Sequence, residues 1–208
     1  MIDTGAVLAF AIAAGLLTLT PGLDTALVLR TAAVEGAFQA RLALAGICVG
    51  LLVWGTATSL GLTALMAVST LAYNVLRIAG AGYLVYLGIQ MWRRDHKFQV
   101  GAAPNATRGA QSWLVRGLLT NLLNPKVGVF YITLLPQFIP RGASVIGYSM
   151  LFTLIHVAEG LLWLTILTTA VRPLRAWLSR GSVVRALDCG TGTVLIGCGV
   201  ALALEGRR

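Results

Sequence analysis

The stretch Asn121-Leu122-Leu123-Asn124-Pro125-Lys126 places two amides, a proline and a cation inside a hydrophobic segment that ends at Pro136-Gln137-Phe138. In hydrocarbon every backbone polar group needs a partner, so a broken helix is tolerated only where protein or a water-filled cavity satisfies the freed groups. Many transporters build their substrate sites near the bilayer midplane from such discontinuous helices. The stretch therefore predicts a broken membrane helix in a small transporter.

The composition around this stretch is that of a protein that crosses the membrane several times. Of 208 residues, 57% are hydrophobic and 11% are charged, whereas soluble domains carry about 25% charged residues. Each apolar block is long enough to cross about 30 Å of hydrocarbon. The blocks cover residues 6–29, 42–65, 70–92, 115–138, 145–170 and 185–204. The sequence thus predicts an all-α integral membrane protein with six transmembrane helices.

The two sets of three predicted spans resemble each other. Span one carries Thr20-Pro21-Gly22, and span four carries Asn124-Pro125-Lys126 at a comparable depth. Since each half has an odd number of spans, the second half would be inverted relative to the first, as in many transporters. We expect one transmembrane domain over residues 1–208, with half-repeats over about 1–92 and 113–208 joined by a loop over 93–112. We therefore predict an inverted repeat of three plus three spans, in which helices one and four are broken.

The net charge of +9 comes from basic residues in the polar segments between the blocks. No basic run interleaved with aromatic residues is present, so nucleic acid is not an expected partner. The first, third and fifth loops hold Arg30 and Arg41; Arg93, Arg94, Lys97, Arg108 and Arg116; and Arg172, Arg175, Arg180 and Arg185, whereas the other polar segments hold only Arg141, Arg207 and Arg208. Cytoplasmic loops carry an excess of Lys and Arg. These three loops are therefore predicted to be cytoplasmic, with both termini on the outer, periplasmic side.

In span one, a proline is followed closely by a carboxylate. Pro21 has no N–H group and clashes with the carbonyl of Leu17, and Gly22 adds backbone freedom, so the span should kink or unwind there. Asp24 would cost about 2.5–3.5 kcal/mol near a bilayer centre, so it should face the protein interior or a cavity. Thr20, Pro21, Gly22 and Asp24 are candidate substrate-binding residues. The alternative is that Pro21 only bends the helix and that Asp24 lies near an interface.

In span four, Pro125 frees the carbonyl of Asn121, and the amides of Asn121 and Asn124 can replace lost backbone hydrogen bonds. Lys126 is a candidate partner for Asp24 or for a substrate carboxylate. Asn121, Asn124, Pro125 and Lys126 therefore complete the candidate substrate site. The alternative for Lys126 is a side chain that extends to the cytoplasmic interface, because the span begins only about ten residues earlier.

Span five contains two ionisable residues on one helical face, His156 and Glu159. Ionisable residues within a membrane often form proton relays, and histidine changes charge near neutral pH. Together with Asp24, they are the candidate proton-coupling residues. A structural hydrogen-bonded pair is the alternative.

Gly46 and Gly50 form a close-packing pattern for helices. We expect this pattern to act within the chain, with a homodimer interface as the less favoured use.

Several functional classes lack their signatures. No HExxH, GxSxG or Walker A motif is present, so neither an enzyme nor a nucleotide-driven pump is expected. The three cysteines form no CxxC pair, and the histidines are His96 and His156 alone, so no metal site and no cofactor is expected. An ion gradient is the expected energy source. A metal-cation or other small-solute exporter of related fold stays open as an alternative, and a membrane-embedded enzyme is less favoured.

A set of motifs runs from about Gly15 to Leu204. It comprises Pro21-Gly22 with Asp24 and Thr25, Gly36, Gly46 and Gly50, Gly80 with Tyr83-Leu84 and Tyr86-Leu87-Gly88, Asn124-Pro125-Lys126 with Phe130, and Pro136-Gln137-Phe138. These motifs resemble those of the LysE/RhtB family of amino-acid exporters. The resemblance implies a six-span protein of the bacterial inner membrane that exports amino acids such as homoserine, threonine, leucine or lysine by proton antiport.

Two positions depart from the pattern of this family. Leu23 stands where a second proline is common, which suggests a milder break in span one. Trp54 follows the span-two glycines, where polar residues are common, and suggests an uncharged or apolar amino acid as substrate.

We expect alternating access around a site between the two broken spans, where half-helix N-termini and Lys126 hold the substrate carboxylate. Asp24 would meet the substrate α-ammonium group or a proton.

Overall fold

The computed structural model of the chain describes residues 2–68, 70–93, 110–169 and 180–204, and all regular elements in these ranges are helical. The elements are α1 (Thr4–Leu19), α2 (Leu23–Val34), α3 (Ala37–Val68), α4 (Thr70–Arg93), α5 (Ala110–Leu122), α6 (Pro125–Val129), the π-helix η1 (Phe130–Leu134), the 3₁₀-helix η2 (Leu135–Phe138), α7 (Val145–Thr169) and α9 (Gly181–Leu204). The predicted all-α class is therefore confirmed. Most of the predicted basic loop 93–112 and part of the basic loop after Thr169 lie outside the described residues.

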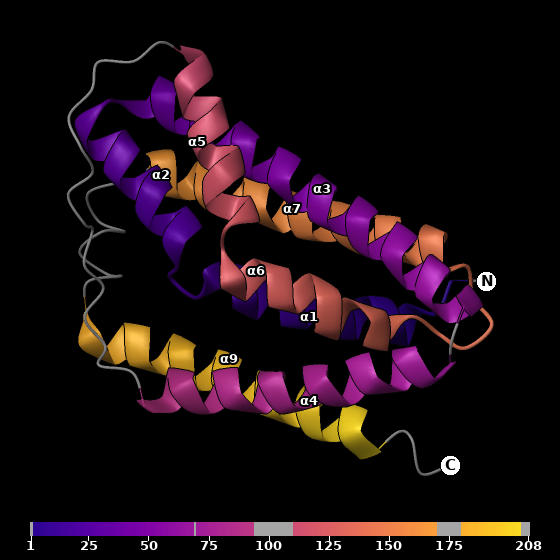
Figure 1. The fold of residues 1–208 in the computed structure, drawn as a ribbon. Coiled ribbons are helices and arrows are strands. Elements are labelled where there is room, and N and C mark those ends of the chain that lie inside the picture. Colours follow the sequence, from indigo (N-terminus) through magenta and orange to yellow (C-terminus); the bar gives the residue numbers. More distant parts are fainter. Residues whose placement is uncertain (1, 69, 94–109, 170–179, 205–208) are drawn as a thin grey trace.

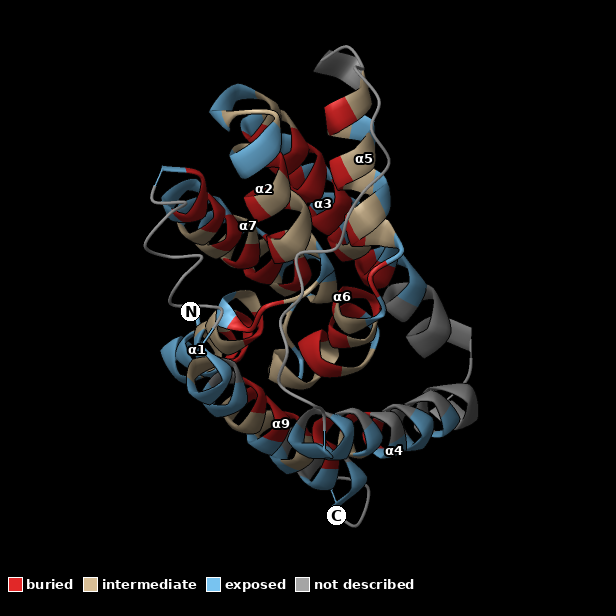
Figure 2. Cartoon of the chain, turned by 90° about the vertical axis from the view of Figure 1, so that its left-hand side faces the viewer, coloured by how far each residue is buried: buried red, intermediate tan, exposed pale blue. Residues whose placement is uncertain are grey.

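The helices are arranged in three layers (Figure 1). On one side α3 packs against α2, α5 and α7, and on the other side α4 and α9 lie side by side. Helices α1 and α6 lie between these two groups, as the perpendicular view also shows (Figure 2). The break in each bent pair therefore brings one half-helix into the middle of the molecule.

Two kinds of candidate membrane span occur among the described residues. The segments Ala37–Gly61 of α3 and Val145–Thr169 of α7 are each long and apolar enough to cross a membrane. The pairs Thr4–Leu19 with Leu23–Val34 and Ser112–Leu122 with Pro125–Phe138 are bent by 50° and 52°, and each pair could form one broken span. The predicted breaks near Pro21 and Pro125 are thus confirmed. The count of six spans and the inverted repeat stay predictions.

The first break follows from residues that cannot continue a helix. Thr20 ends α1 in an extended conformation, with φ −68° and ψ 120°. Gly22 precedes α2, with φ −151° and ψ −163°, and makes no capping hydrogen bond because it has no side chain. Between them Pro21 supplies no N–H group to the carbonyl of Leu17. The N-terminal end of α2 is therefore left without a side-chain cap.

The second break is capped more fully. Asn124 is extended, with φ −79° and ψ 106°, and its side chain accepts a hydrogen bond of 3.2 Å from the backbone N–H of Lys126. Pro125 begins α6, the position where its fixed φ and missing N–H are best tolerated. A π-helix and a 3₁₀-helix follow before the segment ends at Phe138. Irregular helix of this kind often marks functional positions.

An aromatic cluster holds α1 against the second broken segment and α7. The ring of Phe10 lies 4.4 Å from that of Phe152, in a stacked arrangement, and 5.6 Å from the rings of Phe130 and Phe138. Phe10, Phe130 and Phe152 are almost completely buried. Since aromatic pairs add to the free energy of burial, this cluster fixes the half-helix α1 relative to η1, η2 and α7.

Glycines bring α3 and α5 into backbone contact. A Cβ atom at Gly46 would overlap the carbonyl of Leu114, and one at Gly117 would overlap the carbonyl of Ala43. A Cβ at Gly50 would lie 2.5 Å from Oδ1 of Asn121. The expected close packing of Gly46 and Gly50 within the chain is therefore confirmed. This packing places Asn121 beside α3, at the level of the second break.

The substitution Gly46→Ala should destabilise the fold by about 1–3 kcal/mol, because its methyl group has no room against the α5 backbone. Gly61→Ala on the same helix is the matched control, since a Cβ there meets nothing within 4 Å. The melting temperatures of both variants in detergent would test this. Equal melting temperatures for the two variants would contradict the close approach of α3 and α5.

Candidate functional site

A cavity lies where the two helix breaks meet. Its volume is about 50 Å³, enough for a few water molecules. The cavity is lined by the polar residues Thr18, Thr20, Asp24, Thr25, Asn124, Lys126 and His156 and by Gly22. Its apolar lining includes Leu17, Ile47, Leu51, Val127 and Leu164. Residues of α1, α2, α3, α6 and α7 therefore converge on one small space.

The ammonium group of Lys126 binds the backbone at the end of α1. Its Nζ atom donates hydrogen bonds of 2.7 Å to the carbonyl of Leu17 and 2.8 Å to the carbonyl of Thr20. Leu17 has lost its helical donor because Pro21 carries no N–H group. Lys126 thus supplies hydrogen bonds that the broken helix α1 cannot make for itself. Lys126 is partly buried and lies against the first break.

The carboxylate of Asp24 is held from the other broken helix. Nδ2 of Asn121 donates a hydrogen bond of 2.8 Å to Oδ2 of Asp24. Oδ1 of Asp24 is buried and has no hydrogen-bond partner. Asn121 itself is fully buried and does not line the cavity. One acceptor of a carboxylate that lines the cavity is therefore available to a bound molecule.

The helix ends add fixed partial charges around these two side chains. The carbonyls that bind Lys126 belong to the C-terminal end of α1, which carries partial negative charge. The N-terminal end of α2, without a side-chain cap, lies at Gly22 and carries partial positive charge. The cavity therefore offers an electronegative face at the end of α1, which Lys126 occupies, and the N-terminal end of α2, whose partial positive charge lies beside the carboxylate of Asp24 in its first turn.

The two ionisable residues of α7 are placed differently. His156 is 4% exposed, lines the cavity, and stacks on Tyr131 with ring centroids 5.7 Å apart. Its Nδ1 atom is buried without a hydrogen-bond partner. Glu159 lies outside the cavity lining and faces α1, where a Cβ on Gly15 would be 3.8 Å from its Oε1 atom. The structure therefore brings His156, but not Glu159, to the site.

The two prolines shape the site without lining the cavity. Pro21 is buried and Pro125 is exposed, and neither is part of the lining. Thr20, Gly22, Asp24, Asn124 and Lys126 line the cavity directly. Residues that the sequence predicts as one site are thus also adjacent in the fold, and their binding role stays a prediction.

Thr191 of α9 contacts the first break and was not among the predicted site residues. Its hydroxyl donates a hydrogen bond of 3.2 Å to the carbonyl of Leu16 and forms a second hydrogen bond with the hydroxyl of Thr20. Thr191 is 2% exposed, whereas Thr193 in the same Gly-Thr-Gly-Thr segment is exposed. The sequence offers two equivalent threonines, so only the helix orientation identifies the one that faces α1.

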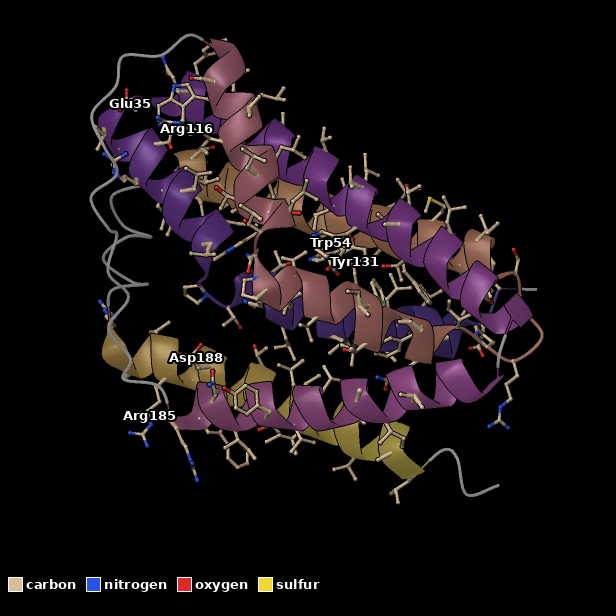
Figure 3. All side chains as sticks on the ribbon, viewed as in Figure 1. Glu35, Trp54, Arg116, Tyr131, Arg185 and Asp188 are labelled. Atoms are coloured by element: carbon tan, nitrogen blue, oxygen red, sulfur yellow. The ribbon has the colours of Figure 1, made fainter. Side chains whose placement is uncertain are left out.

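Trp54 lies one helical turn from the cavity instead of lining it. Its ring covers Gly128 of α6, where a Cβ would be 2.9 Å from the indole. Figure 3 shows Trp54 and Tyr131 together between α3 and α6. The indole Nε1 and the hydroxyl of Tyr131 are buried without hydrogen-bond partners. The expectation that Trp54 narrows the site itself therefore stays a prediction, since Leu51 supplies the lining on that side.

The residues around the cavity include no metal centre. In the part of the chain that the structure describes, no group of three or more His, Cys, Asp or Glu side chains could hold a metal ion. The functional groups that line the cavity are one carboxylate, one ammonium group, one imidazole, one amide and several hydroxyl groups, together with two helix ends. Such an arrangement can bind a small molecule that carries both charges.

Comparison with known proteins gives one family and several relatives. The model of the LysE type translocator family matches residues 15–206. A homoserine/homoserine lactone efflux protein of Salmonella typhi is 29% identical over 196 residues, covering 94% of both chains. A threonine efflux protein of Escherichia coli is 27% identical over 193 residues, covering 90% of this chain and 92% of the relative. An uncharacterized membrane protein of Bacillus subtilis is 26% identical over 206 residues, covering 95% and 98%. No solved structure matches.

The hydroxyl of Thr191 should contribute to the stability of the site. Thr191→Val removes the hydrogen bonds to the end of α1 and leaves that break less well satisfied, which should cost about 1 kcal/mol. Thr193→Val is the matched control, since that exposed hydroxyl bonds only within α9, to the carbonyl of Cys189. Thermal unfolding in detergent would compare them. A Thr191 variant that melts no earlier than the Thr193 variant would refute the contact between α9 and the break.

Proposed function

Because the chain belongs to the LysE type translocator family, we propose that it exports an amino acid or a close derivative through the cavity between its two broken helices. The protein is a membrane transporter of the amino-acid efflux class and not an enzyme. One observation carries the proposal most directly. A carboxylate, an ammonium group and two oppositely polarised helix ends meet in one small cavity inside a protein with several candidate membrane spans.

The proposed site complements the two charges of an amino acid. The substrate carboxylate binds at the electropositive N-terminal end of α2, near Gly22, with Lys126 close by. The substrate ammonium group binds on the side of Asp24, whose Oδ1 atom has no other partner. Thr20, Asn121 and Asn124 complete the site by holding the two breaks in place, and Pro21 and Pro125 create them.

Transport then follows alternating access in a six-span protein built as an inverted repeat, with half-repeats over about 1–92 and 113–208 forming one transporter domain. One observation supports this proposal: the two bent pairs have similar angles, 50° and 52°. Since the cavity is too small for a whole amino acid, loading and release require movement around it.

The proposed orientation places the protein in the bacterial inner membrane, with both termini in the periplasm. The described ends of α1 and α9, Thr4 and Leu204, lie at the same end of the molecule (Figure 1). Large apolar side chains such as Leu8, Leu154 and Leu162 are exposed on the helices and would contact lipid.

The names of the relatives favour a small, uncharged side chain on the substrate. Homoserine and threonine both carry a hydroxyl group, and they appear in the names of the two efflux proteins compared above. Proteoliposomes loaded with labelled homoserine, threonine, leucine or lysine would test the proposal. We expect efflux of at least one of the first three, and release of none of the four would contradict the proposed function.

Removing the charge of Asp24 should impair this efflux. Asp24→Asn keeps the size of the side chain but removes the anion that faces the substrate ammonium group, so efflux should fall about tenfold or more. Asp3→Asn is the matched control, because Asp3 caps α1 through Ala6 N–H and asparagine caps equally well. Wild-type efflux by a normally expressed Asp24 variant would exclude the carboxylate from the site.

The proposed driving force is a proton gradient, with Asp24, His156 and Glu159 as the candidate carriers. Efflux should accelerate when an inward proton gradient is applied to loaded vesicles, and a protonophore should abolish the acceleration. His156→Gln should reduce the response more than Glu159→Gln, because only His156 lines the cavity. A rate that is independent of the gradient would exclude proton antiport while leaving amino-acid export in place.

A further inference from the structure

The ammonium group of Lys126 occupies a site that also suits the amine of a substrate. We infer that this ammonium group is a tethered stand-in for the substrate ammonium group: it binds the carbonyls of Leu17 and Thr20, and the substrate amine replaces it there. This inference rests on the proposed function for its transport role. The binding site itself can be tested without transport.

The two carbonyls form an ammonium site. They lie at the C-terminal end of α1 and bind Nζ of Lys126 at 2.7 and 2.8 Å. An ammonium group has three donors and no acceptor, so it suits a site made of acceptors at the negative end of a helix. Asp24 lines the same cavity and offers an acceptor, Oδ1, that is buried and unsatisfied. The electronegative face therefore recognises a primary ammonium group from whichever molecule supplies it.

The stand-in is part of a different broken helix from the one it binds. Lys126 lies in the first turn of α6, whereas its carbonyl partners lie at the end of α1. Its four-carbon stem is flexible and its charge compact, so it can leave the carbonyls without unfolding either helix. A Cβ on Gly22 would lie 3.9 Å from Nζ, so the ammonium group also lies next to the N-terminal end of α2. Once displaced, it is close to where the substrate carboxylate is proposed to bind.

The Lys126 ammonium group should affect the return of the protein without substrate more than the movement of the protein with substrate bound. With substrate bound, the substrate amine satisfies the carbonyls and balances Asp24, so the loaded protein can close. Without substrate, Lys126 satisfies the carbonyls, and its loss would leave buried polar groups with poorer partners, which is costly. A protein without this lysine should therefore exchange substrate across the membrane but return empty only slowly.

Chemical rescue tests the site without relying on transport. Lys126→Ala should melt at a lower temperature than the wild type, and n-butylammonium, a primary amine with a four-carbon chain, should raise its melting temperature by binding the vacated carbonyls. Tetramethylammonium has no N–H group and should not. Lys97→Ala, at the only other lysine in the chain, is the matched control and should respond to neither. A folded Lys126→Ala protein without a selective response to n-butylammonium would overturn the inference.

A transport assay tests the role in the cycle. In proteoliposomes, Lys126→Met should lower net efflux about tenfold or more beyond any loss in the exchange of labelled for unlabelled threonine or homoserine, since an unsatisfied polar group costs enough for that factor. Lys97→Met should leave both rates unchanged. Equal loss of exchange and net efflux, or no loss of either, would overturn the stand-in role.

The outcomes also separate this inference from the proposed function. If the wild-type protein releases none of the amino acids tested, the proposed function fails, and the rescue experiment alone decides whether the carbonyls bind an ammonium group. If the wild type exports them but n-butylammonium does not rescue Lys126→Ala, the function stands and the inference fails. If Lys126→Ala does not fold, Lys126→Met, which preserves the volume of the stem, decides the question by its exchange and net rates.

Discussion

The structure depends on how a broken helix satisfies its backbone inside an apolar protein. Pro21 ends α1 early, and the carbonyls of Leu17 and Thr20 then receive hydrogen bonds from Lys126 instead of from the next helical turn. In hydrocarbon such carbonyls could not be left without partners. The side chain that satisfies them comes from the second break, so the two interruptions stabilise each other. One ammonium group thus connects two segments more than a hundred residues apart.

Other contacts reinforce this junction from each neighbouring helix. Asn121 bonds Asp24 across the breaks, Gly50 of α3 leaves room for Asn121, and Thr191 of α9 bonds the end of α1. Polar groups that remain unsatisfied, such as Oδ1 of Asp24 and Nδ1 of His156, lie at or beside the cavity. Because buried polar groups are normally paired, these two atoms are candidate contacts for a bound molecule. The family and its efflux relatives agree with that interpretation.

Much of this could be predicted from the sequence, for physical reasons that are local. Prolines flanked by amides and threonines in apolar segments have few stable arrangements, so the breaks at Pro21 and Pro125 were predictable. The partner of Lys126 was not, because a flexible side chain can reach an interface, a carboxylate or a carbonyl equally well by sequence alone. The roles of Thr191 and Glu159 depend on helix rotation, which weakly amphipathic membrane helices do not reveal. Only tertiary packing shows that Thr191 faces α1 and that Glu159 lies outside the cavity lining.

The central claim is that an amino acid binds where the two breaks meet and takes the place of Lys126. The most direct test is a structure of the protein in a lipid nanodisc with an exported amino acid bound. We expect the substrate ammonium group within hydrogen-bond distance of the carbonyls of Leu17 and Thr20, with Nζ of Lys126 displaced from both. A substrate bound elsewhere, or Lys126 still bonded to both carbonyls in the loaded state, would contradict it.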